Sequence, residues 1–245
     1  MKAEVLFQTQ DYQYIVLGRD PDKPDYVIDT NEYLIVHKGR GLLMDPGGTE
    51  IFPEVVNGIS EFVSIDQIDA IFGSHQDPDI LSSLALWLSV CPEARIHVPW
   101  LWTGFITHFG CTQENMVPIP DEGGQIDLAG HSLEVIPAHY LHSSGNLHLY
   151  DPKSKILFSG DVGAALLPDD QTDLFVSDFD SHTQYMKGFH QRWMPSNVAR
   201  DQWIERVRAM DIQMMCPQHG AIFKGDDVSR FLDWFGSLEL GQAQN

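Results

Sequence analysis

The chain has 245 residues, enough for one large domain or two small ones, and its 43% hydrophobic and 20% charged content is that of an ordinary globular protein. Its formal net charge of -20, from 15 basic and 35 acidic residues, argues against binding DNA, RNA or anionic lipid through a basic face. No leader peptide and no apolar run of about 18 residues is visible, so we expect a soluble, cytoplasmic protein without a membrane partner.

The first half of the chain alternates strands and helices. Apolar runs and alternation predict strands at 14–18, 32–36, 41–44, 69–75 and 95–98. A turn rich in Pro and Asp is expected at 20–25, and a tight turn follows the third strand at 45–48. Helical spacing predicts helices at 51–62 and 80–90.

The second half repeats this rhythm. We expect strands at 125–128, 132–137, 146–150, 155–159 and 212–216. We expect helices at 182–193, 197–210 and 227–238. Two halves of strands, each followed by helices, predict a sandwich of sheets covered by helices, and therefore one compact α/β domain.

Metal-binding side chains follow four of these strands. His75, Asp77 and Asp79 alternate directly after the strand that ends near residue 74. His142 opens a small-residue turn between two strands. Asp161 lies between Gly160 and Gly163, and His219 follows the strand at 212–216. Imidazole and carboxylate groups at strand ends suit a divalent metal, and α/β folds place their chemistry at that edge.

These motifs resemble the metallo-β-lactamase superfamily, and most closely the di-iron domain of the flavodiiron proteins. That domain reads H-x-E-x-D-H, H-W-P-D-S-M, S-x-D-A-F-G and P-x-H-G. The matching segments here are His75–Ile80, His142–Leu147, Ser159–Gly163 and Pro217–Gly220, with a fifth likeness at Tyr185–Phe189. The resemblance spans roughly residues 30 to 225 and is similar in particular to stand-alone oxygen-binding di-iron proteins. It implies a single αββα sandwich domain, 1–245, without the flavodoxin domain or FMN site of the reductases.

The resemblance also implies the ligands of two metal ions. His75, Asp77 and His142 would hold one ion, Asp79 and His219 the other, and Asp161 would bridge them. Asp77 replaces the usual Glu, and Ile80 replaces a His, which leaves the second ion short of protein ligands. The oxygen-rich donor set favours two Fe ions, with Mn or Zn as alternatives.

Several residues compete with this assignment. His139 precedes His142 by three residues, but the spacing of 19 residues from His142 to Asp161 matches the family better. His148 has strand spacing and is expected to be a satisfied sheet residue. Cys216 is expected to be a buried, inert thiol, because the three cysteines form no C-x-x-C pair and indicate a reducing compartment. We treat the remaining histidines, His37, His97, His108, His131, His182 and His190, as structural or surface residues.

Three functions follow from the resemblance. The leading one is a non-haem di-iron protein that binds or senses dioxygen. The first alternative is an O2 or NO reductase fed by a separate electron-donor protein, and the second is a dinuclear hydrolase of a phosphodiester or thioester. A redox or signalling protein partner and a homodimer are expectations by resemblance only.

Overall fold

The computed structural model describes residues 1–19 and 27–242, so the turn expected at 20–25 lies outside the described residues. The chain divides into two compact units, Met1–Leu133 and Glu134–Asn245, which are described in turn. Across the described ranges, no helix is long and apolar enough to cross a membrane. The predicted α/β class is confirmed, because both sheets and helices are present.

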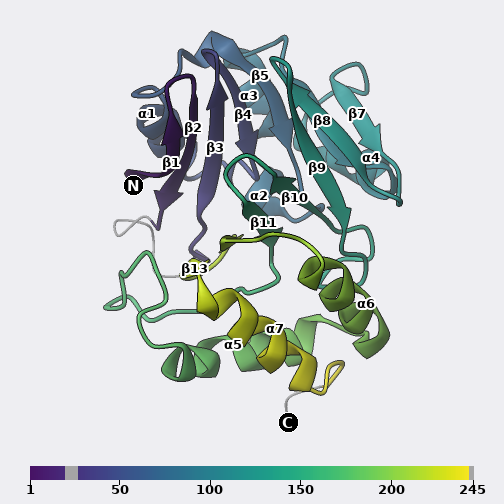
Figure 1. The fold of residues 1–245 in the computed structure, drawn as a ribbon. Coiled ribbons are helices and arrows are strands. Elements are labelled where there is room, and N and C mark those ends of the chain that lie inside the picture. Colours follow the sequence, from purple (N-terminus) through teal and green to yellow (C-terminus); the bar gives the residue numbers. More distant parts are fainter. Residues whose placement is uncertain (20–26, 243–245) are drawn as a thin grey trace. The chain divides into compact units, whose positions relative to one another are not determined.

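Unit 1 contains a mixed sheet whose strands lie in chain order (Figure 1). The strands are β1 (Lys2–Thr9), β2 (Tyr12–Gly18), β3 (Glu32–His37), β4 (Arg40–Met44), β5 (Ile68–Phe72), β6 (Arg95–Pro99) and β7 (Met116–Ile119). Strands β1 to β4 pair antiparallel, whereas β4 to β7 pair parallel. The parallel part brings the carboxyl ends of β4, β5 and β6 to one edge of the sheet, where a site can form.

The helices of unit 1 are α1 (Phe52–Ile59), α2 (Pro78–Leu81), α3 (Leu84–Val90) and α4 (Thr103–Ile106). The single helix predicted at 80–90 is therefore wrong, because the helix is interrupted at Ser82 and Ser83. The Ser83 hydroxyl donates to the carbonyl of Gly47 (2.6 Å), a contact that sequence spacing does not reveal. Pro78 begins α2, where its missing N–H costs no helical hydrogen bond.

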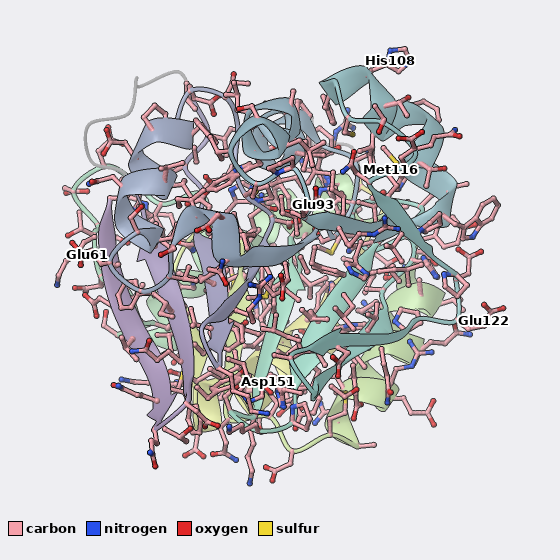
Figure 2. The ribbon with its side chains drawn as sticks, turned by 90° about the horizontal axis from the view of Figure 1, so that it is seen from above. Glu61, Glu93, His108, Met116, Glu122 and Asp151 are labelled. Carbon is pink, nitrogen blue, oxygen red and sulfur yellow. The ribbon has the colours of Figure 1, made fainter. Side chains whose placement is uncertain are left out.

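The core of unit 1 is apolar and closed to solvent. Branched side chains of the sheet pack with the helices, and Trp87 of α3 is fully buried against them. Three acidic side chains of this unit, Glu61, Glu93 and Glu122, are exposed, and Glu61 and Glu122 lie at the edges of the view in Figure 2. These solvated carboxylates account for part of the negative charge without any bound cation.

The second sheet has the order β13-β12-β11-β10-β9-β8. Its strands are β8 (Gly124–Leu128), β9 (His131–Pro137), β10 (Leu147–Asp151), β11 (Ile156–Gly160), β12 (Met214–Pro217) and β13 (Phe223–Lys224). The boundary between the units falls inside β9, so β10 to β13 belong to unit 2. Strands β11 and β12 pair parallel, which places the residues that follow them, Asp161 and Gln218, at the same edge.

The helices of unit 2 are α5 (Phe179–Trp193), α6 (Asn197–Arg208) and α7 (Asp226–Ser237). Helix α5 begins three residues before its predicted start, because the Asp178 carboxylate accepts from the backbone N–H groups of Asp180 and Ser181. It ends before Pro195, which cannot continue a helix. Buried aromatic side chains, among them Trp203, Phe231 and Phe235, fill the core of this unit.

Candidate metal centre

In unit 1, His75 lies just past the end of β5 and is 1% exposed. The Ser74 hydroxyl donates to Oδ2 of Asp45 (2.5 Å), and the Ser74 backbone N–H donates to Oδ1 of the same carboxylate (2.7 Å). Because that hydroxyl proton points at Asp45, the Ser74 oxygen is left to accept from Nδ1 of His75 (2.8 Å). This arrangement puts the proton of His75 on Nδ1 and makes Nε2 the nitrogen that can donate a lone pair to a metal.

Asp45 and Ser74, to which the sequence assigned no role, hold the His75 ring through hydrogen bonds. Asp45 is completely buried and has a φ of +42°, a left-handed conformation that Asp tolerates better than most residues. The sequence predicted a tight turn at this position but assigned the carboxylate no role. The available signal was a carboxylate at the end of an apolar strand, the same pattern that singled out Asp161.

Asp77 and Asp79 belong to the loop and first turn that follow His75. Nε2 of His75 lies 3.5 Å from Oδ2 of Asp77, while the Gln76 amide donates to Oδ1 of Asp77 (2.8 Å). Asp79 is half-buried in the first turn of α2. Ile80 is completely buried in the apolar core of unit 1. At the position where the flavodiiron motif has a His, this chain therefore has a core side chain and no donor.

In unit 2, one buried carboxylate lies between two imidazoles. Asp161, 2% exposed, follows β11. Its Oδ2 lies 3.2 Å from Nε2 of His142, and its Oδ1 lies 3.2 Å from Nε2 of His219. The structure thus brings His142, Asp161 and His219 together within unit 2, and His75 and Asp77 together within unit 1.

The distances between these imidazole nitrogens and carboxylate oxygens fit pairs of donors that bind the same metal ion. Two N or O donors at about 2.1 Å from one ion, at tetrahedral to octahedral angles, are about 3.0–3.4 Å apart. Both imidazole–carboxylate separations of Asp161 are 3.2 Å and fall in this range, whereas the His75–Asp77 separation of 3.5 Å is slightly longer. A buried charge is costly unless it is paired, and Asp161 with two imidazoles is a donor set that a divalent cation would complete.

The backbone at His142 is strained. His142 has a φ of +75° and Tyr140 a φ of +62°, both in the left-handed region that side chains other than Gly rarely adopt. Each such residue costs about 1–2 kcal/mol. Local hydrogen bonds hold the loop, including one from the Tyr140 N–H to the carbonyl of Ser143 (2.8 Å) and one from the Asn146 amide to the carbonyl of Leu141 (2.7 Å). Strain of this kind gathers at functional sites, which agrees with a ligand role for His142.

The loops that carry Asp161 and His219 are joined by backbone hydrogen bonds. The Gln218 N–H donates to the carbonyl of Gly160 (2.8 Å), and the Ala165 N–H donates to the carbonyl of His219 (3.1 Å). Gly220 permits this approach, because its φ is +86° and a Cβ there would lie 2.7 Å from Cβ of Ala165. The Gly-rich segments seen in the sequence are therefore needed for the close contact between these two loops.

His190 supports the Asp161 loop from α5. It is completely buried, accepts from the Gly163 N–H through Nε2 (3.0 Å) and donates from Nδ1 to the carbonyl of Met186 (2.8 Å). Burial lowers the pKa of His190 to about 4, so the ring is neutral, as this pair of hydrogen bonds requires. The expectation that His190 is structural is confirmed.

Helix α5 also places two aromatic rings on His142. The Phe189 ring is stacked on the imidazole at a centroid distance of 5.7 Å and an interplanar angle of 15°. The Trp193 ring lies at 5.5 Å and 43°. The sequence reasoning noted the segment that ends at Phe189 but gave Trp193 no role.

The competing residues behave as expected where the structure tests them. His148 is buried in β10 and accepts from the Trp203 indole N–H (3.1 Å), so it is a satisfied sheet residue. Cys216 is a buried thiol. His108 is exposed at the periphery of unit 1 (Figure 2). His139 is half-buried at the start of the His142 loop.

Comparisons with known proteins identify the family and the fold. The family described as "ODP family beta lactamase" matches residues 28–220. Two structures of the chemotaxis sensor ODP, one a peroxy diiron species and one the apo state from T. denticola, are 45% identical to this chain. They align over 98% of it and over 97% and 96% of their own chains, with TM-scores of 0.87 and 0.88.

More distant proteins share the fold. The rubredoxin oxygen:oxidoreductase of Desulfovibrio gigas is 18% identical over 95% of this chain and 61% of its own, with a TM-score of 0.82. An uncharacterized protein of Methanocaldococcus jannaschii is 26% identical over 88% of this chain and 54% of its own length. The chain spans about half the length of this curated relative and about a third of those from Nostoc and Synechocystis. The predicted metallo-β-lactamase-like fold and the resemblance to flavodiiron proteins are confirmed.

Proposed function

This chain belongs to the ODP family of beta lactamases, and we propose on that basis that it is a non-haem di-iron protein that binds dioxygen and acts as an oxygen sensor. The observation that carries the proposal is the buried Asp161 carboxylate with an imidazole 3.2 Å from each of its oxygens. The nearly full-length similarity of the chain to a chemotaxis sensor described as a peroxy diiron species supports the same conclusion.

We propose by the resemblance that residues 1–245 form one di-iron domain with a single dinuclear site. His75, Asp77 and His142 would hold one iron, and Asp79 and His219 would hold the other. Asp161 would bridge the two, because each of its oxygens already has its own imidazole neighbour. The mixture of imidazole and carboxylate donors suits iron, with Mn or Zn as alternative occupants.

The residues of this chain prepare the site in two ways. Ser74 and Asp45 orient the His75 ring so that Nε2 is the donor atom. Ile80 supplies no donor, so one coordination position is left for an external ligand. When bound, two ferrous ions supply the electrons and open positions that dioxygen binding requires.

The two alternative functions have less support. The oxygen reductase among the similar structures is 18% identical, a level that supports the fold alone, whereas the sensor is 45% identical. No specific feature of the described residues favours a phosphodiester or thioester substrate. We further propose a cytoplasmic location, O2 rather than NO as the ligand, a signalling protein partner, and a homodimer by resemblance.

Anaerobic metal analysis tests the proposal directly. We expect about two irons per chain after reconstitution with Fe(II), and a new absorption band after O2 is added. Asp161→Asn is nearly isosteric but lacks the charge, so it should bind less iron and lose the O2 response. Two zinc ions and no spectral response to O2 would contradict the proposal. Repeated O2 consumption with a supplied electron donor would favour the reductase instead.

A further inference from the structure

The two aromatic rings that cover His142, Phe189 and Trp193, are here called the α5 aromatic pair. They lie four residues apart on α5 and therefore on one face of the helix, and their own rings are stacked at 6.2 Å and 29°. Both contact the same imidazole, which is itself 8% exposed at its side chain.

The exposure of Trp193 is not explained by core packing. The residue is 56% exposed, although an indole gains about 25 cal/mol for each Å² of apolar surface that it buries. Phe189 alone already provides the stacked contact with the imidazole. Trp193 is therefore a ring that reaches from solvent to a buried ligand candidate within 5.5 Å.

We propose that Trp193 is the contact through which electrons from outside reach the iron centre. The inference rests on the proposed di-iron function, because it takes His142 as an iron ligand. Electron tunnelling falls off exponentially with distance, and an imidazole bound to iron is electronically coupled to it. An aromatic one-electron donor that stacks on the exposed indole would thus lie one ring away from a ligand, with no need to enter the site.

The transfer balances without any bond to the protein. The donor is oxidised by one electron, and one ferric ion becomes ferrous. Two donor molecules therefore return a fully oxidised centre to the diferrous state, ready to bind dioxygen again. For a sensor, this step resets the oxygen-exposed protein.

Reduction of the ferric protein by reduced methyl viologen, a one-electron donor with a flat aromatic face, tests the proposal. The anaerobic rate per bound iron is measured by stopped flow. Trp193→Leu removes the ring, and we expect its rate to fall about tenfold, equal to about 1.4 kcal/mol of activation free energy. Trp193→Phe keeps a ring on the imidazole and should fall less. The matched control is Trp100→Leu, since Trp100 is also exposed, at 49%, and its indole N–H donates to Asp121 (2.8 Å), which is not a candidate ligand.

A second readout does not depend on electron transfer. Fe(II) bound next to the His142 ring should quench the tryptophan emission of Trp193. In an anaerobic Fe(II) titration, the decrease in fluorescence should therefore be smaller in Trp193→Phe than in the native protein. It should be retained in Trp100→Leu. A native reduction rate per bound iron in Trp193→Leu would overturn the proposal. Failure of the unsubstituted protein to bind iron would instead overturn the proposed function, so the two failures are distinguishable.

Discussion

Ser74→Ala should show how much the orientation of the His75 ring contributes to metal binding. The substitution changes this orientation but leaves the ligand nitrogen in the chain. The substitution removes the hydroxyl that donates to Asp45 (2.5 Å) and accepts from Nδ1 of His75 (2.8 Å). The backbone N–H of residue 74 still donates to Asp45 (2.7 Å), so the buried carboxylate keeps one of these two hydrogen bonds. His75 keeps its position in the chain but loses the partner that sets its tautomer.

The magnitude follows from these contacts. A hydrogen bond to a charged group contributes about 1.5–3 kcal/mol, so the free energy of unfolding of the metal-free protein should fall by an amount in this range. Loss of a group that orients a metal ligand typically weakens metal binding about 10–100-fold. This weakening corresponds to about 1.4–2.7 kcal/mol in the free energy of iron binding.

The assay combines urea denaturation of the metal-free protein with anaerobic Fe(II) titration. Ser83→Ala is the matched control, because it also removes a buried serine hydroxyl of unit 1, one that donates to the carbonyl of Gly47 (2.6 Å). It should lower the free energy of unfolding by about 0.5–1.5 kcal/mol, the contribution of a neutral hydrogen bond. Iron affinity should stay within about threefold of native, because this hydrogen bond orients no candidate ligand. Equal iron affinities in Ser74→Ala and the native protein would refute the orienting role of Ser74.

Three further predictions concern stability. Gly220→Ala should destabilise the protein by about 1–3 kcal/mol in urea denaturation, because Gly220 has a positive φ and a Cβ there would meet Ala165. The control Gly104→Ala should not destabilise the protein, because Gly104 has open space around it. Burial lowers the pKa of His182 from 6.5 to about 4. Below pH 6.5 the unfolded state therefore binds more protons than the folded state. The free energy of unfolding should fall by up to about 3 kcal/mol as the pH drops from 6.5 to 4. In metal-free protein, His182→Phe should show a smaller loss between pH 7.5 and pH 4.5; an equal loss would assign the effect to other groups. Removing iron with a chelator should lower the melting temperature, since a ligand at 100 times its Kd stabilises by about 2.7 kcal/mol; an unchanged melting temperature would count against iron binding to the folded state.

Local pattern was sufficient for most strands and for the helices of unit 2. The strands at 32–36 and 155–159 were predicted within a residue or two, because continuous apolar runs bounded by turn residues have few other solutions. Pattern failed where a tertiary contact decided the outcome. At the break between α2 and α3, the Ser83 hydroxyl donates to the carbonyl of Gly47, 36 residues away. Strand β1, with no fully buried residue, gave little periodic signal and was not predicted.

The sequence by itself determined the class of fold and the chemical types of the candidate ligands, because strand ends followed by His or Asp are local features that a reader can identify. Only the tertiary structure showed that Asp161 lies between two imidazoles, and that Asp45 and Ser74 set the donor atom of His75. It also placed Trp193 against His142, 51 residues away in the chain. These contacts join segments far apart in sequence, so their geometry depends on sheet pairing and helix packing rather than on any local pattern.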